Sequence, residues 1–139
     1  MCNRDCQNHP RWLLERVECV CVERGFGFYL SNPCFELWLL FHFEDIISSR
    51  SNEEKASLLR NKRKSNGTPA ERFLAQVAGH HKSIDRQKFE DDYRGRIHTA
   101  IDNASQFPQD TFHLMTNMGS NIPDLMKFLD LPKESWNAS

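Results

Sequence analysis

Two titratable side chains interrupt the most apolar stretch of the chain, SNPCFELWLLFHFED, which covers residues 31–45. Glu36 follows a cysteine and a phenylalanine, and His42 comes six residues later. Burying either group without a polar partner costs free energy, so both are candidates for a functional site. Residues six apart do not share a helix face, so these two are not expected to hold one ion together. Each also has a structural explanation: Glu36 as a helix-start carboxylate favoured by the dipole, and His42 as a satisfied core histidine.

Cysteine and histidine side chains early in the chain have the chemistry of a zinc site. The candidate ligands are Cys2, Cys6, Cys19, Cys21 and His9. Their Cys-x3-Cys and Cys-x-Cys spacings match the usual zinc motifs poorly, and Cys21 falls on an apolar helical face. The chain has 5 cysteines, an odd count. We therefore expect reduced thiols rather than disulfides or zinc ligands.

A basic run in the polar middle of the chain could bind the phosphates of a nucleic acid. It consists of Arg60, Lys62, Arg63 and Lys64. Arg94 and Arg96 could add to such a patch. The formal net charge is -1, so no overall basic field accompanies the run, and a solvated loop is the alternative. No glycine-rich phosphate loop is expected, because the glycines at 25 and 27 follow a predicted helix rather than precede one.

Two further polar segments are less specific. Asn3, Arg4 and Asp5 place a carboxylate near the amino end, with His9 close behind. The segment His80-His81-Lys82 separates two expected helices, where a loop could carry side chains to a cleft. From the residues alone, the first segment is a frayed terminus and the second an exposed connector.

Hydrophobic spacing predicts the elements that position these residues in the first third of the chain. Apolar residues recur at helical spacing from Arg11, and Gly25 stands where a helix would stop. The β-branched run 17–22 leaves a strand as the alternative there. Residues 26–30 are expected to form a short buried strand. A helix over 33–45 should follow, with Asn32 as its N-cap, Pro33 at its first position and nearly every side buried.

The remaining two thirds of the chain are predicted to be helical. A short helix is expected around 53–61, and Thr68 with Glu71 forms a capping box for a helix that ends at Gly79. Residues 89–104 show the clearest amphipathic period and predict one long helix, and a last helix is expected over 123–129. No repeat is found, and the polar middle does not divide the chain into two domains.

The size of the chain and its apolar runs predict one globular domain. It has 139 residues, 39% hydrophobic and 27% charged. No basic-then-apolar leader follows Met1, and the segment 31–45 is too short and interrupted to span a bilayer. We therefore expect a cytoplasmic protein that does not associate with membranes.

The string SNPCFELWLLFHF, residues 31–43, resembles the signature of the RloB-like family. Members of this family occur in bacterial defence and restriction-linked loci, often beside a gene for an ABC-type ATPase. Asn3-Arg4-Asp5 with His9 is similar to the family's Asp-x-Asp segment, and Lys82 with the helix after it is similar to a Lys-then-helix segment. The resemblance extends from about residue 3 to residue 130 and is specific only over 31–43.

The resemblance implies an α/β fold: a truncated Toprim-like parallel sheet over about 1–47, a predominantly helical part over about 50–130 and a loose tail over 131–139. It implies a Mg²⁺- or Mn²⁺-dependent nuclease, or nuclease subunit, that acts in phage defence (abortive infection or restriction) with an ABC-type ATPase, and a possible homo-oligomer. Asp5, Glu36 and Lys82 would be the catalytic residues. Asp5 and Asn3 would hold the metal, with Asn32 and His42 in support. Glu36 would face the metal cleft or fix Asn32 and Lys82.

Two departures from the family pattern bear on whether the chain is an enzyme. Asn3 stands where the family has an aspartate, which removes a negative charge from the metal site. The family's opening strand and its glutamate would lie before Met1. The alternative is a non-catalytic interaction module, or degenerate relative, that has lost the metal site and packs its apolar helix on a partner.

Overall fold

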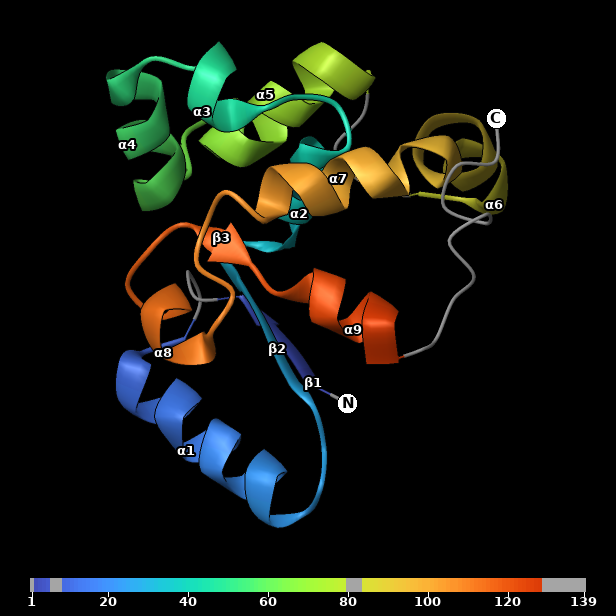
Figure 1. Ribbon diagram of the computed structural model, residues 1–139. Coiled ribbons are helices and arrows are strands. Elements are labelled where there is room, and N and C mark those ends of the chain that lie inside the picture. The colour runs from blue at the N-terminus through green and yellow to red at the C-terminus, as the bar shows by residue number, and fades with distance from the viewer. Residues whose placement is uncertain (1, 6–8, 80–83, 129–139) are drawn as a thin grey trace.

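The computed structural model describes the backbone of residues 2–5, 9–79 and 84–128, and the side chains of residues 9–79 and 84–127. Within these residues the chain is mixed α/β and mostly helical, as the predicted class requires. Figure 1 shows a small sheet toward one end of the molecule and a group of helices at the other. In the described part of the chain, no helix combines the length and apolar character needed to cross a bilayer.

Three short strands form one sheet in the order β1 (Cys2–Asp5), β2 (Phe28–Asn32) and β3 (Gly119–Ser120). β1 is parallel to β2, with Asp5 opposite Ser31. β3 is antiparallel to β2 and joins it through two residues. The described strands therefore make a mixed sheet with one parallel pair, and they do not show the Toprim-like parallel sheet expected from the sequence.

The helix α1 (Arg11–Glu23) connects the two parallel strands, so the helical interpretation of this segment is confirmed over the strand alternative. It buries Leu14 and Cys21. With Phe28 and Leu30 of β2, and Leu114 at the end of α8 (Thr111–Leu114), they form a small hydrophobic cluster. This cluster is separate from the main core.

The apolar stretch forms α2 (Phe35–Phe41), which is shorter than the predicted helix over 33–45. The N-cap is Cys34, so the prediction of Asn32 as N-cap is wrong. Asn32 ends β2, and its side-chain amide donates to the carbonyl oxygens of Leu114 (2.8 Å) and Asn117 (3.0 Å). The peptide bond between Asn32 and Pro33 is cis. The observed N-cap therefore differs from the predicted one, because the Asn32 side chain instead holds the end of α8 and the turn after it.

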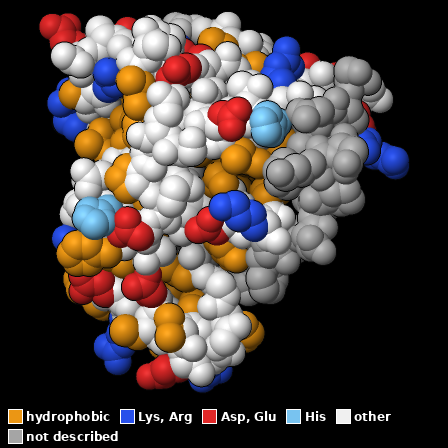
Figure 2. All heavy atoms as spheres, in the orientation of Figure 1, with side chains coloured by type: hydrophobic (Ala, Val, Ile, Leu, Met, Phe, Trp, Pro, Cys, Tyr) orange, Lys and Arg blue, Asp and Glu red, His pale blue; other side chains and the backbone are white. Residues whose placement is uncertain are grey.

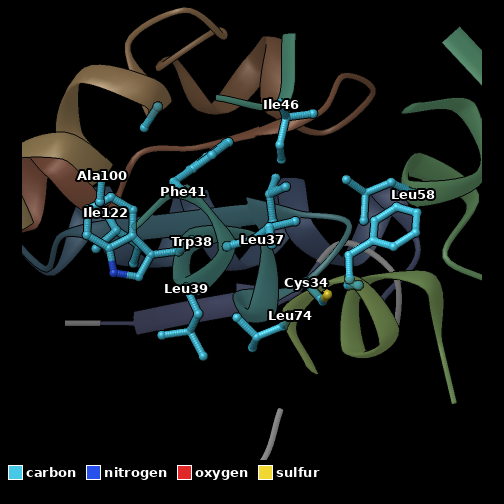
Figure 3. Packing of buried hydrophobic residues seen from close by; sticks show 14 of the residues in the cluster. Cys34, Leu37, Trp38, Leu39, Phe41, Ile46, Leu58, Leu74, Ala100 and Ile122 are labelled. Carbon is cyan, nitrogen blue, oxygen red and sulfur yellow. The ribbon is translucent and has the colours of Figure 1, made fainter. Parts of the chain in front are cut away.

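All sides of α2 except its first turn are covered by other parts of this chain. Residues 37–41 are all buried, and the helix packs against α5 (Pro69–Ala78), α7 (Ile97–Ala104) and the sheet. Figure 3 shows its side chains spreading between those of α4 (Asn52–Arg60) and α5 on one side and those of α7 and α9 (Ile122–Phe128) on the other. The chain itself therefore buries residues 37–41, and only the first turn of this helix, with Phe35 37% exposed, is left on the surface.

Between α2 and α5 the chain forms α3 (Ile46–Ser49) and α4, and the predicted capping box of α5 is confirmed. Thr68 Oγ1 accepts from the Glu71 backbone N–H, and Glu71 accepts from the Thr68 N–H. Gly79 ends α5 in the left-handed conformation that glycine adopts without strain. Arg50 links the segment after α2 to α5, because it pairs with Glu44 at 2.8 Å and lies over the Phe73 ring.

The predicted continuous helix over 89–104 is wrong. The segment consists of α6 (Arg86–Lys88), a π-helical turn η2 (Phe89–Tyr93), a 3-10 turn η3 (Arg94–Arg96) and then α7. The 3-10 turn contains Gly95, which has a low helix propensity. The apolar period survives across the break because Tyr93, Ile97 and Ala100 are all buried on one side.

The last described helix, α9, is fixed to the sheet at its start. Asn121 Oδ1 accepts from the Leu30 N–H at 2.7 Å, and the Asn121 N–H donates back to the Leu30 carbonyl. These two bonds place α9 beside β2 and bring its apolar face to the α2 core.

Candidate nucleic-acid-binding pocket

A basic pocket lies where α4 ends, the following loop turns and α5 begins. Its volume is about 280 Å³. The residues that line it are Ser57, Arg60, Lys62, Lys64, Pro69 and Arg72. Three of the four predicted basic residues thus surround one depression, together with an arginine from the next helix.

The sharp turn after α4 is what folds the basic run around this pocket. Asn61 adopts a left-handed conformation (φ 47°) and is buried. Its Oδ1 accepts from the Ala70 N–H at 3.0 Å, and its Nδ2 donates to the Cys34 sulfur at 3.4 Å. Asparagine tolerates this backbone conformation better than most residues, and here its amide also ties the turn to α5 and α2.

The cations of the pocket are available for a ligand. Arg60, Lys62 and Lys64 are exposed, and none of them forms an ion pair within the described residues. Arg72 is half-buried, and its guanidinium donates to Asn66 Oδ1 and to the Gly67 carbonyl, neither of which neutralises its charge. Four positive charges therefore face a polar depression without a neighbouring carboxylate in its lining.

Arg63, the fourth predicted nucleic-acid-binding residue, is used differently. Its guanidinium pairs with Glu71 at 2.7 Å, and the Glu71 side chain is only 7% exposed. The hydrogen bond and the charge of Glu71 raise the pKa of Arg63, and Glu36 adds a smaller attraction. Arg63 therefore serves as the counter-ion of a buried carboxylate, and it is not part of the pocket lining.

Glu36 lies in the first turn of α2 and is half-buried. The charge of Glu36 attracts Arg63, so Glu36 lies near the basic run of residues 60–64. No hydrogen bond among the described residues joins Glu36 to Asn32, whose amide is used elsewhere. The expected contact with Lys82 lies outside the described residues.

His42 lies beyond the other end of α2 and is 4% exposed. Its Nδ1 is 3.0 Å from the Trp38 carbonyl oxygen, and its ring packs edge-on against Trp38 and Tyr93. Burial lowers the pKa of His42 to about 4, so the imidazole is neutral at pH 7. These contacts are those of a buried core histidine.

The expected metal ligands are only partly described. The backbone of Asp5 pairs with Ser31 next to Asn32, but the side chains of Asn3 and Asp5 lie outside the described set, as does Lys82. Among the described side chains, no three His, Cys, Asp or Glu residues are grouped so that they could hold a metal ion. Cys19 is an exposed free thiol and Cys21 a buried one.

Arg94 and Arg96 do not extend the basic pocket. Arg94 pairs with Glu90, and Arg96 lies over the Phe43 ring. Arg72 and Ser57, which do line the pocket, were missed by the sequence analysis. Arg72 follows the capping box of α5 directly, but only the turn at Asn61 brings it to the basic run.

Comparison with protein-family models identified the family of this chain. A model described as RloB-like protein matches residues 7–129 of the chain. Comparisons with curated proteins and with solved structures gave no match.

Proposed function

The chain belongs to the RloB-like family, and on this premise we propose that it binds the phosphates of a nucleic acid through the basic pocket. The observation that carries the proposal is the grouping of four cations, Arg60, Lys62, Lys64 and Arg72, around one polar depression. Phosphate contacts supply most of the affinity of sequence-independent nucleic-acid binding.

The charge distribution supports a local interaction surface rather than a general electrostatic attraction. The chain as a whole has a formal net charge of -1. Arg63, the neighbouring cation, is paired with Glu71, so it adds little free positive charge beside the pocket. A polyanion that approaches this face meets concentrated positive charge, and its counterions are released on binding.

The test is the affinity for fluorescently labelled single-stranded and duplex oligonucleotides of DNA and RNA, measured by anisotropy over a series of salt concentrations. The variant Lys62→Ala/Lys64→Ala should bind about tenfold more weakly at low salt. It should also lower the slope of log K against log salt by about 2, one for each lost phosphate contact. Both lysines are exposed, so the fold is not expected to change.

The matched control is Arg16→Ala/Arg24→Ala, which removes two exposed cations at the α1 end of the molecule. It should leave both the affinity and the salt slope close to those of the unmodified chain. Equal losses in the two double variants would show that binding is not localised in the pocket and would contradict the proposal.

We further propose that nucleic-acid binding serves a metal-dependent nuclease, or nuclease subunit, of bacterial phage defence. The support is family membership and the parallel β1–α1–β2 unit, which is the kind of unit from which a Toprim-like sheet is built. A Mg²⁺ or Mn²⁺ ion bound there would supply Lewis-acid chemistry to the phosphate. Asp5 and Asn3 would hold the ion, with Glu36 and Lys82 in support.

Cleavage of a labelled oligonucleotide in the presence of Mn²⁺ tests this part of the proposal. Asp5→Ala should abolish cleavage, whereas Asp124→Ala, which removes an exposed carboxylate on α9, should not. Cleavage that persists unchanged in Asp5→Ala would come from a contaminant. Phosphate binding and cleavage can fail separately, because the first depends on the pocket and the second on the carboxyl end of β1.

A second candidate is a non-catalytic interaction module that binds the ABC-type ATPase of its locus. Asn3 in place of an aspartate favours it, and so do three exposed apolar side chains at the α1 end. Trp12 is 65%, Val22 73% and Phe112 64% exposed. Co-purification with the ATPase should be lost in Trp12→Ala/Phe112→Ala and kept in Val77→Ala, which changes an exposed residue on α5. Light scattering on the chain alone tests the expected self-association.

A further inference from the structure

A second cavity lies away from the basic pocket and shares no lining residue with it. It has a volume of about 230 Å³ and lies between α2, the π-helical turn η2, and α7. Its walls are almost entirely apolar and include Trp38, Leu39, Phe89, Tyr93 and Ile97. The one imidazole in its lining is His42.

The hydrogen bonding of His42 determines what its ring offers to the cavity. Nδ1 lies 3.0 Å from the Trp38 carbonyl oxygen. A carbonyl can only accept, so Nδ1 carries the proton and donates, and Nε2 is left as an acceptor. No described residue donates to Nε2. The low pKa of His42, about 4, keeps the ring in this neutral form at pH 7.

A buried acceptor without a donor costs free energy, and a ligand that supplies the donor removes that cost. His42 is 4% exposed and cannot satisfy Nε2 by turning into bulk solvent, because Trp38 and Tyr93 pack against its ring. The cavity thus combines an apolar body with one oriented hydrogen-bond acceptor, which is the usual composition of a small-molecule site.

The backbone beside the cavity is also unusual. Phe89 and Tyr93, which line it, are the first and last residues of the π-helical turn. Such turns are uncommon and occur frequently at functional sites. The apolar period of the sequence alone predicted an uninterrupted α-helix here.

We propose that this cavity binds a small neutral aromatic molecule of one or two rings that donates one N–H or O–H hydrogen bond to His42 Nε2. Its size follows from the volume: a cavity of about 150 Å³ holds benzene, so 230 Å³ accommodates a fused two-ring molecule. A charged ligand is disfavoured, because the apolar walls offer no counter-charge.

Two ligands of nearly equal shape test the proposal on the unmodified full chain. Indole carries an N–H donor, and benzofuran has an oxygen in its place and no donor. In a titration followed by amide chemical shifts, indole should shift the signals of residues around Trp38, His42 and Tyr93 and bind about tenfold more tightly than benzofuran. That ratio corresponds to about 1.4 kcal/mol.

The variant His42→Phe should bind the two ligands equally, because it keeps a ring and removes the acceptor. If this variant does not fold, the comparison of the two ligands on the unmodified chain decides the question alone. Equal affinities there would overturn the proposal. So would shifts confined to the exposed apolar residues of α1, or no shift of the cavity residues at the solubility limit of indole.

Discussion

The two ends of the molecule are built on unequal cores. α2 has 7 residues and buries five consecutive ones, Leu37 to Phe41, in the main cluster. α1 has 13 residues and buries only Leu14 and Cys21. Isolated helices of either length are marginal in water, so tertiary burial decides how firmly each is held. The shorter helix is therefore the structural centre, and the longer one is peripheral.

The surfaces over the two ends differ in the same sense. Figure 2 shows hydrophobic side chains exposed among charged ones over α1 and α8. Their most exposed members are Trp12, Val22 and Phe112. α1 also lacks a side-chain cap at its start, whereas α4 and α5 each begin with a complete capping box. We expect the α1 end to open at a lower free energy than the helical end.

The largest effect is expected from Phe41→Ala in the main core. Phe41 is fully buried and stacks on Phe107 with ring centroids 5.4 Å apart. Its removal should lower the free energy of unfolding by about 4 kcal/mol, measured by urea denaturation. Phe112→Ala, at an exposed ring, is the control and should change it by less than about 0.5 kcal/mol. Similar losses in both variants would break the distinction between the two ends.

The pH dependence of the main core follows from His42. Its pKa is lowered from 6.5 to about 4 by burial, so the unfolded chain binds a proton more readily than the folded one. The stability that the neutral, buried His42 contributes is fully present above pH 6.5 and is lost as the pH falls toward 4. The loss is about 3 kcal/mol, from a shift of roughly 2.5 pKa units at about 1.4 kcal/mol each.

The measurement is the free energy of unfolding at several pH values between 4 and 7, compared with a variant. His42→Phe should lose the part of the slope that His42 contributes, while His113→Ala, at an exposed histidine, should keep it. An unchanged slope in His42→Phe would mean that carboxylates alone cause the acid sensitivity.

Leu14→Ala tests the smaller cluster. Leu14 is 2% exposed and contacts the β2 and α8 side of the cluster. Its loss should cost about 2 kcal/mol, near the low end for a buried leucine because its cluster is smaller than the main core. Amide exchange should accelerate in α1 and β2 while α2 and α5 remain protected. Uniform acceleration across all helices would show that the two ends unfold as one unit.

Local signals in the sequence predicted several features of the helical part correctly. The capping box at Thr68, the stop at Gly79 and the buried helix after Pro33 all depend on residues a few positions apart. Such signals act through backbone hydrogen bonds and conformational preferences within one element.

Several differences between expectation and structure arose where a residue outside the local element claims the same group. Asn32 has the chemistry of an N-cap, but its amide donates to two carbonyls more than eighty residues away. Arg63 belongs to the basic run by position, but the buried Glu71 pairs with it. Arg72 joins the pocket only because Asn61 turns the chain. Spacing alone does not reveal which side chain a buried partner will require.

The smallest effect is expected at the two capping boxes. Comparing them tests whether burial of the cap, rather than the box itself, determines how much the cap stabilises the helix. Thr68 is buried, whereas Ser51 is exposed. Thr68→Ala leaves the Glu71 N–H without its acceptor in a buried site, so we expect a loss of about 1–2 kcal/mol in urea denaturation. Ser51→Ala leaves the Glu54 N–H open to water and should cost only about 0.5 kcal/mol. Equal losses in the two variants would mean that burial does not change the energy of a capping hydrogen bond. The difference in stability between the two ends would then come from apolar packing alone.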